Sequence, residues 1–139
     1  MKVTLICWCR NDEDVTQAAK DYCSRVDYHY FGCRRAALPQ TLARLEADAA
    51  LIVTAHGNDD VFGESHDNFT DMTVQEFAEA LIKSAQKSWS GAIYLDICHG
   101  FDYAQKLKPL IRQTFPGVRV FGAVGETGVR IDISAHQEA

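Results

Sequence analysis

Short apolar runs alternate along the chain with segments whose apolar residues recur at helical spacing. The runs are rich in β-branched residues and end in polar or glycine-containing turns, a pattern typical of strands buried in a parallel sheet. Apolar positions three or four residues apart predict amphipathic helices between them. The expected strands are 2–9, 26–33, 49–56, 91–98, 118–124 and 129–133, and the expected helices are 12–25, 39–47, 74–87 and 101–115.

This alternation predicts an α/β fold, arranged as a three-layer α/β/α sandwich with about six mostly parallel strands. The four residues GETG (125–128) join the last two expected strands, and so short a connection predicts an antiparallel hairpin. The tail, 134–139, is expected to be loose. Since no linker, repeat or low-complexity segment interrupts the pattern, we expect one domain over residues 1–139.

Composition narrows the classes of function. The net charge of −5 argues against the basic surface of a nucleic-acid-binding protein. No apolar run is long enough for a membrane span, and strand-like sequence begins at once, without the pattern of a signal peptide. The five cysteines have no recognisable metal-binding spacing and are expected to be reduced. We therefore expect a cytoplasmic protein with no nucleic-acid partner, no membrane partner, no metal and no cofactor.

Two expected strands end in side chains capable of catalysis. One ends in His56-Gly57 and the other in Cys98. In an open α/β sheet ligands bind at the carboxyl ends of the strands, so these residues are expected to lie close together. A cysteine is a competent nucleophile when a base such as histidine is nearby. The pattern predicts acyl transfer, with Cys98 as nucleophile and His56 as base.

Two further groups fit this chemistry. The backbone N–H groups of Gly57 and Cys98 are candidate donors to an oxyanion, and a helix is expected to start just after Cys98, where its dipole favours negative charge on the sulfur. Asp96 faces the same way as Cys98 because side chains alternate along a strand. A carboxylate there would favour a basic side chain in the substrate.

Each residue also has a structural explanation. His56 could be a solvated histidine at a strand end, Cys98 a small core residue, and Asp96 a cap for the following helix. Their occurrence together, at the ends of two strands expected to be neighbours, favours a functional site.

The motifs LIVTAHG (51–57) and AIYLDICHG (92–100) resemble those of the caspase-like cysteine peptidases, which include caspases, metacaspases, legumain and gingipains. In that group an apolar strand ends in His-Gly, and a second apolar strand ends in a polar residue, any residue and the nucleophilic cysteine. The histidine and cysteine lie about 50 residues apart in caspases, and His56 and Cys98 have a similar spacing. DICHG (96–100) is most similar to the metacaspase form.

The resemblance implies a caspase-like sandwich in which Cys98 is the nucleophile, His56 the base, and Gly57 and Cys98 the oxyanion donors. It also implies that Asp96 lines the primary specificity pocket, so that cleavage follows Arg or Lys. His99 matches a position without an agreed chemical role, and we interpret it as structural. Two departures stand out: residues 115–117 leave no room for a processing loop, and the substrate-binding loops are reduced to GETG, which predicts shallow peptide recognition.

Two further features have alternative interpretations. Some metacaspases bind calcium, and a loop rich in carboxylates follows His56, but a solvated acidic loop explains it better because an EF-hand spacing is missing. Glu126 could touch substrate or belong to a plain turn. The acidic loop contains Asp59, Asp60, Glu64, Asp67 and Asp71.

The sequence therefore predicts a small caspase-like cysteine hydrolase, an endopeptidase that cleaves a peptide or protein after a basic residue. The alternative is a non-catalytic α/β binding module that retains the histidine and cysteine. A flavodoxin-like or response-regulator-like domain is disfavoured because CRNDED (9–14) replaces a phosphate-binding glycine loop. A Cys-x5-Arg phosphatase is excluded at Cys98, because HGFDYA (99–104) contains no arginine.

Overall fold

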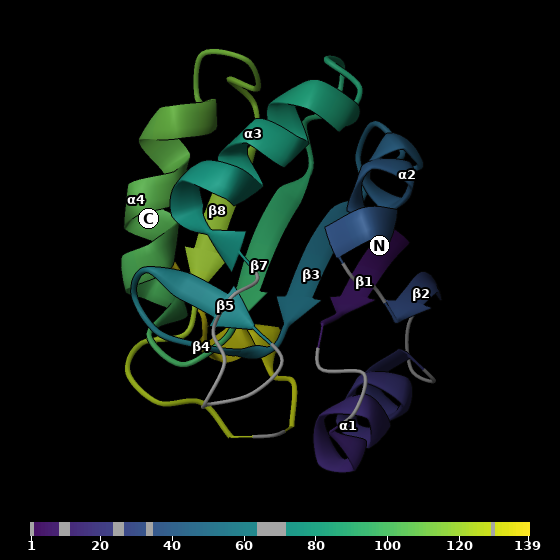
Figure 1. Ribbon diagram of the computed structural model, residues 1–139, viewed down its shortest axis with the longest axis vertical. Helices are drawn as coiled ribbons and strands as arrows, with labels where there is room; N and C mark the ends of the chain where they lie inside the picture. Colours follow the sequence, from purple (N-terminus) through teal and green to yellow (C-terminus); the bar gives the residue numbers. More distant parts are fainter. Residues whose placement is uncertain (1, 9–11, 24–26, 33–34, 64–71, 129) are drawn as a thin grey trace.

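The computed structural model (Figure 1) describes residues 2–8, 12–23, 27–32, 35–63, 72–128 and 130–139. A six-stranded sheet in the order β2-β1-β3-β7-β8-β9 forms its centre, and a second sheet consists of three short strands, β4-β5-β6. The expected α/β class with a mostly parallel sheet is confirmed. The strands of the large sheet are β1 (Lys2–Cys7), β2 (Asp27–Gly32), β3 (Ala50–Thr54), β7 (Ala92–Asp96), β8 (Arg119–Gly122) and β9 (Gln137–Glu138).

The helices follow the strands in the expected order, although each is shorter than expected. They are α1 (Glu13–Cys23), α2 (Leu38–Ala43), α3 (Val74–Ser84) and α4 (Gly100–Ile111). Helices α2, α3 and α4 pack side by side, whereas α1 contacts β1 and β2. Thr73 caps α3 through a reciprocal capping box with Glu76. None of the helices in the described parts of the chain has the length and apolarity that crossing a membrane requires.

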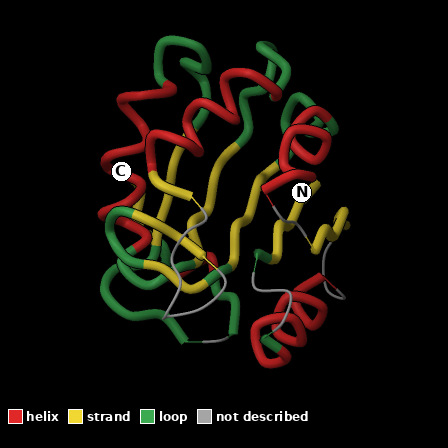
Figure 2. The backbone as a smooth tube through the Cα atoms, in the orientation of Figure 1, coloured by secondary structure: helices red, strands yellow, loops and turns green. Residues whose placement is uncertain are grey.

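The first five strands of the order run parallel, so their carboxyl ends meet at one edge of the sheet. Figure 2 shows this edge at the bottom, where loops and turns follow the strands. The register aligns the ends closely: Cys7 of β1 pairs with Thr54 of β3, and Thr54 pairs with Asp96 of β7. The segments that follow these three strands therefore begin next to one another.

The small sheet lies at the same edge. Strand β4 (His56–Gly57) pairs with β5 (Val61–Gly63), which pairs with β6 (Met72–Thr73). Phe62 of β5 is fully buried, and its ring contacts the rings of Trp8, Phe77 and Tyr103 at centroid distances of 5.4 to 5.6 Å. This aromatic cluster attaches the hairpin to the main core, and the hairpin in turn positions His56 and Gly57.

A close backbone contact fixes the start of α4. A Cβ atom added to Gly122 of β8 would lie 2.1 Å from the carbonyl carbon of Gly100, and one added to Gly100 would lie 2.2 Å from the carbonyl oxygen of Leu95. Only glycine permits this approach at either position. The first turn of α4 therefore rests directly on β7 and β8, which places the preceding turn, with Cys98, at the edge of the sheet.

Three expectations about local structure were wrong. No strand forms in residues 130–133: this segment is irregular and leads into a 3-10 turn at Ile133–Ala135. The antiparallel partner of β8 is β9, in the tail expected to be loose, where Arg119 binds Glu138 and holds the tail against the sheet. The loop after His56 contains β5, because Phe62 buries its ring there.

The spacing of the apolar residues in 101–115 predicts that Tyr103, Leu107, Leu110 and Ile111 face the core, and this is wrong at one position. Tyr103, Leu107 and Ile111 are buried, but Leu110 is 40% exposed. Leu110 lies three residues after Leu107 but at the edge of the buried stripe, which Ile111 already occupies.

Candidate active site

The structure brings His56, Asp96 and Cys98 together around one small cleft at the carboxyl edge of the large sheet. The cleft has a volume of about 60 Å³. Its lining comes from β3, the segments after β3, β7 and β8, and helix α1. The lining residues are Val15, Thr54, Ala55, His56, Asp96, Cys98, Thr127 and Gly128.

His56 is oriented by the carboxylate of Asp12, a residue that no sequence motif had indicated as part of the site. Nε2 of His56 lies 2.8 Å from Oδ2 of Asp12, and both side chains are partly buried. The other carboxylate oxygen, Oδ1, accepts hydrogen bonds from the backbone N–H groups of Asp14 and Val15 and so caps α1. Asp12 therefore connects the first turn of α1 to the candidate base. In the sequence, the one indication of a role at the site was that Asp12 follows the first expected strand, 2–9, at its carboxyl end.

The contact between Asp12 and His56 lowers the pKa of the carboxyl and decides which nitrogen of the imidazole carries the proton. The hydrogen bond from His56, together with those from the backbone N–H groups of Val15 and Asp14, holds the pKa of the Asp12 carboxyl below its ordinary value, against the opposing effect of burial. An ionised carboxylate can only accept, so Nε2 of His56 carries a proton. In the neutral ring, Nδ1 is then the basic nitrogen.

Cys98 lies in a tight turn between β7 and α4. The backbone N–H of Gly100 donates to the carbonyl of Ile97 at 3.0 Å, and that of His99 donates to the carbonyl of Gly125 at 2.6 Å. His99 has a φ of 58°, in the left-handed region that a residue with a side chain adopts only at a cost. Strained turns of this kind occur where surrounding contacts hold a functional side chain in place.

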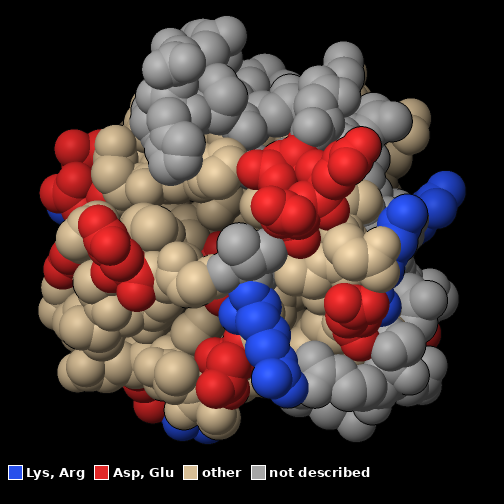
Figure 3. All heavy atoms as spheres, turned by 90° about the horizontal axis from the view of Figure 1, so that it is seen from below, with Lys and Arg blue, Asp and Glu red and all other residues tan. Residues whose placement is uncertain are grey.

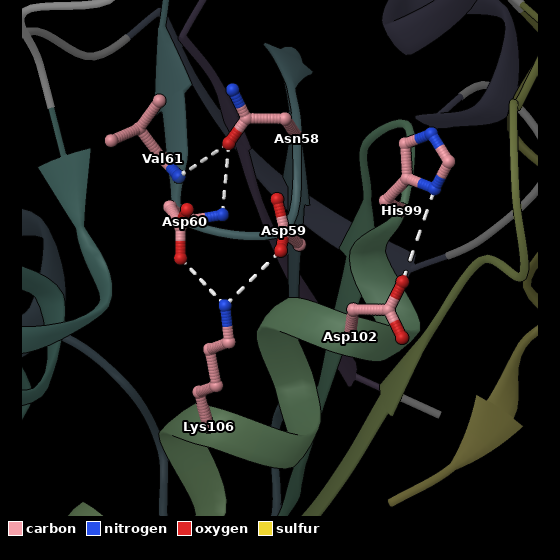
Figure 4. Close-up of polar contacts among 7 residues, drawn as sticks. All are labelled: Asn58, Asp59, Asp60, Val61, His99, Asp102 and Lys106. Atoms are coloured by element: carbon pink, nitrogen blue, oxygen red, sulfur yellow. Dashed lines mark hydrogen bonds and ion pairs between the residues drawn. The ribbon is translucent and has the colours of Figure 1, made fainter.

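The thiol of Cys98 is half-buried, and its Sγ lies 4.0 Å from the carbonyl oxygen of Thr127. The ring of His99 is turned outward, with Nδ1 3.9 Å from a carboxylate oxygen of Asp102 (Figure 4). His99 does not line the cleft. Its structural interpretation stays a prediction that this outward position favours.

Gly57 lies against the Cys98 turn. A Cβ atom added to Gly57 would lie 3.0 Å from Cδ1 of Ile97, the residue before Cys98. The N–H of Asn58 bonds the carbonyl of Val61, so the next pair along the hairpin, Gly57 and Phe62, is a non-hydrogen-bonded pair. The N–H of Gly57 consequently points away from β5. Gly57 is not among the residues that line the cleft, so its role as an oxyanion donor stays a prediction.

Asp96 is deeply buried, and both of its carboxylate oxygens have partners. Oδ2 accepts from the hydroxyl of Thr54 at 3.1 Å, and Oδ1 lies 3.3 Å from Nε2 of His136. The side chains of Asp96 and His136 are only 3% and 2% exposed. These contacts, rather than the N-terminus of α4, engage the carboxylate, and the sequence analysis did not identify His136.

The described part of the acidic loop is tied to α4. Nζ of Lys106 lies 3.2 Å from Oδ2 of Asp59 and 2.6 Å from Oδ1 of Asp60 (Figure 4). The bond from Lys106 holds the pKa of the Asp59 carboxyl below its ordinary value. Among the residues that the structure describes, no cluster of three or more histidine, cysteine or acidic side chains could hold a metal ion. Glu64, His66, Asp67 and Asp71 lie outside the described residues.

The remaining candidates stay outside the cleft. Glu126 does not line it, although its neighbours Thr127 and Gly128 do. Cys7 and Cys23 are buried and reduced, and burial raises the pKa of the Cys23 thiol to about 11. Cys9 and Cys33 lie outside the described residues.

Comparison of the chain with protein-family models and with curated proteins finds no match. The interpretation of the cleft consequently depends on its own geometry and chemistry.

Proposed function

We propose that this protein is a small caspase-like cysteine hydrolase, an endopeptidase that cleaves a peptide or protein after a basic residue. The observation that carries the proposal is the common cleft of Cys98 and His56, with Asp12 on the far nitrogen of His56. Nucleophile, base and orienting carboxylate are the parts that cysteine-dependent acyl transfer needs. In this proposal the protein acts in the cytoplasm, where the thiol stays reduced.

The topology supports the finer architecture. From β1 the chain moves to β2 on one side and later crosses back through β3, β7 and β8 on the other. Right-handed connections then place α1 on one face of the sheet and α2, α3 and α4 on the opposite face. This arrangement supports the proposed three-layer sandwich of the caspase-like group that the two motifs resemble.

In the proposed mechanism, Nδ1 of His56 takes the thiol proton as Sγ of Cys98 attacks the scissile carbonyl. Asp12 stabilises the resulting imidazolium, and the N–H groups of Gly57 and Cys98 donate to the oxyanion. His56 then gives its proton to the leaving amine, which departs and leaves a thioester. Water, deprotonated by His56, attacks this thioester, releases the acid product and restores the thiol.

Charge at the carboxyl edge supports the preference for a basic side chain. Figure 3, the view onto this edge, shows acidic side chains in several groups around the centre and few basic ones. Acidic residues begin both helices that flank the cleft, with Glu13 and Asp14 in α1 and Asp102 in α4. Such a surface raises the local concentration of cationic ligands. Asp96 is the proposed partner of the substrate's basic group within the pocket.

One observation favours the non-catalytic alternative. Pockets for small ligands have volumes of roughly 300 Å³ or more, whereas this cleft has about 60 Å³. A binding module with a closed, unused site would look similar.

A covalent probe separates the two functions. We would treat the protein with a thiol-reactive group placed behind arginine, beside matched probes that carry aspartate or asparagine, and locate the label by mass spectrometry. We expect the arginine probe to label Cys98 fastest, and Cys98→Ala and His56→Ala to abolish that labelling. Labelling by another probe would retain the peptidase and reject the basic pocket. Absence of labelling at Cys98 in folded protein, with or without calcium, would favour the binding module.

A further inference from the structure

The end of the described chain contacts one residue of the candidate site, Asp96. We call residues 130–138 the C-terminal strap; it includes the turn Ile133–Ala135 and strand β9. Between these elements lies His136, whose ring is buried against Asp96 and faces the ring of Tyr94 at a centroid distance of 6.0 Å. Thus the strap contacts the residue proposed to recognise the substrate.

The hydrogen bond to Asp96 uses only one of the two ring nitrogens of His136. An ionised carboxylate only accepts, so Nε2 of His136 donates to Asp96. The other ring nitrogen, Nδ1, is buried and has no hydrogen-bond partner among the residues that the structure describes. A buried polar atom without a partner costs free energy, since it has given up water without replacement. The buried position of His136 against Asp96 is therefore less stable than its burial alone suggests.

The rest of the strap is held mainly at the surface. Arg119 binds Glu138 through two nitrogens, but both side chains are exposed, and exposed ion pairs contribute little. Strand β9 is only two residues long. Ile131 is the apolar side chain of the strap that is fully buried. These contacts allow His136 to leave Asp96 with loss of β9 alone, the short strand at the edge of the large sheet, while the parallel strands keep their pairing.

A basic substrate side chain that binds Asp96 has to replace one of the present partners of this carboxylate. With Thr54 on one oxygen and His136 on the other, the carboxylate of Asp96 has a partner on each side. The cleft is also too small for a ligand side chain as it stands. A guanidinium offers two parallel, charge-assisted donors, which a carboxylate binds more strongly than a single imidazole N–H.

We propose that His136 is a specificity-determining residue that competes with the substrate for Asp96, so that the closed pocket admits a guanidinium in preference to other groups. This inference rests on the proposed function, in which Asp96 receives the basic side chain. An arginine side chain displaces His136 through its fork of donors. The ammonium of lysine, a strongly hydrated point charge without that fork, displaces it less effectively.

Binding of agmatine, a small guanidinium compound, tests the competition without catalysis. In the Cys98→Ala background we would measure its affinity by calorimetry, with and without His136→Ala. Removal of the competing hydrogen bond should tighten binding by about tenfold. Asp96→Asn should abolish binding, and the matched control Gln137→Ala, an exposed neighbour on the strap, should leave it unchanged. Thermal unfolding would verify that each variant folds.

His136→Gln separates competition from a merely structural role, because glutamine retains a neutral donor at this position. We expect its agmatine affinity to stay close to that of the parent. Cadaverine, an ammonium compound, should bind more weakly than agmatine in every folded variant. Equal agmatine affinity with and without His136, or binding in neither, would overturn the proposal.

Kinetics distinguishes this inference from the peptidase itself. With an arginyl amide substrate, His136→Ala should lower KM and leave kcat nearly unchanged, because the residue competes for binding and takes no part in the chemical step. If Cys98 proves unreactive while agmatine still binds more tightly to the His136→Ala variant, the competition for Asp96 is supported and the peptidase activity is rejected. If Cys98 reacts and the affinity for agmatine does not change in His136→Ala, the peptidase activity is supported and the competition for Asp96 is rejected.

Discussion

Asp12 has two roles at the residue scale, and each depends on a different oxygen. Oδ1 caps α1, and Oδ2 holds His56. This division links the fold to the proposed chemistry, since the same side chain starts a helix and sets the tautomer of the base. The two roles can be separated, because asparagine is as good a cap as aspartate but cannot stabilise an imidazolium by charge.

We therefore expect Asp12→Asn to keep the helix cap, to lose only the stability that the charged carboxylate contributes through His56, and to lower kcat by about 10² or more, the range that general-base catalysis contributes. Asp12→Ala should lose the same activity and also about 1 kcal/mol of stability through the lost cap. Urea unfolding and steady-state rates on an arginyl amide would measure both. Asp14→Ala is the control, and unchanged kcat in Asp12→Asn would show that Asp12 only caps the helix.

At the element scale, the hairpin formed by β4 and β5 determines where His56 and Gly57 lie. It has few residues, and the ring of Phe62 supplies its attachment to the core. The other half of the site stands on α4, whose first turn rests on Gly100 and Gly122. Lys106 joins the hairpin and α4 at the surface through Asp59 and Asp60.

Phe62→Ala should destabilise the protein by about 3–5 kcal/mol, as expected for a buried phenylalanine, and Phe62→Leu by less. We expect Phe62→Leu also to slow labelling of Cys98 by the arginine probe, because the hairpin that carries the base loosens. Phe115→Leu is the matched control: Phe115 is equally buried but packs on Trp89, away from the cleft. Similar labelling rates in the two leucine variants would show that Phe62 contributes stability alone.

At the scale of the whole molecule, the stability of the folded protein should decrease at acidic pH because Asp12 becomes protonated. The pKa of its carboxyl is depressed in the folded protein, chiefly by the bond from His56. A depressed pKa contributes stability that is present above the ordinary value of 3.8 and is lost as the pH falls through the lower, folded value. Protonation of Asp12 removes this contribution.

We expect the stability advantage of the parent protein over Asp12→Asn to be constant near neutral pH and to shrink below pH 3.8. Urea midpoints of both proteins across this range would measure it. An advantage that grows as the pH falls below 3.8 would have the wrong sign and would contradict the lowered pKa of Asp12. Asp14→Asn, which has no contact with His56, should follow the parent.

The alternation of apolar runs and amphipathic segments determined most of the architecture. Periodicity depends on local sequence, and it predicted the α/β class and the parallel strands. It also identified the residues that the cleft brings together, since strand ends such as His56 and Cys98 can be recognised locally. It failed for β9, whose position depends on pairing with β8, and for β5, which forms because Phe62 reaches a distant core.

Only the tertiary structure decided which distant side chains complete the site. Asp12 and His136 each bond a residue at least 40 positions away, and no local pattern indicates such partners. Hydrophobic periodicity reports which face of an element is buried, whereas a hydrogen bond between two polar side chains depends on the positions of both elements. The sequence by itself determined the nucleophile and base candidates, and the packing of α1 and the C-terminal strap against the sheet decided what surrounds them.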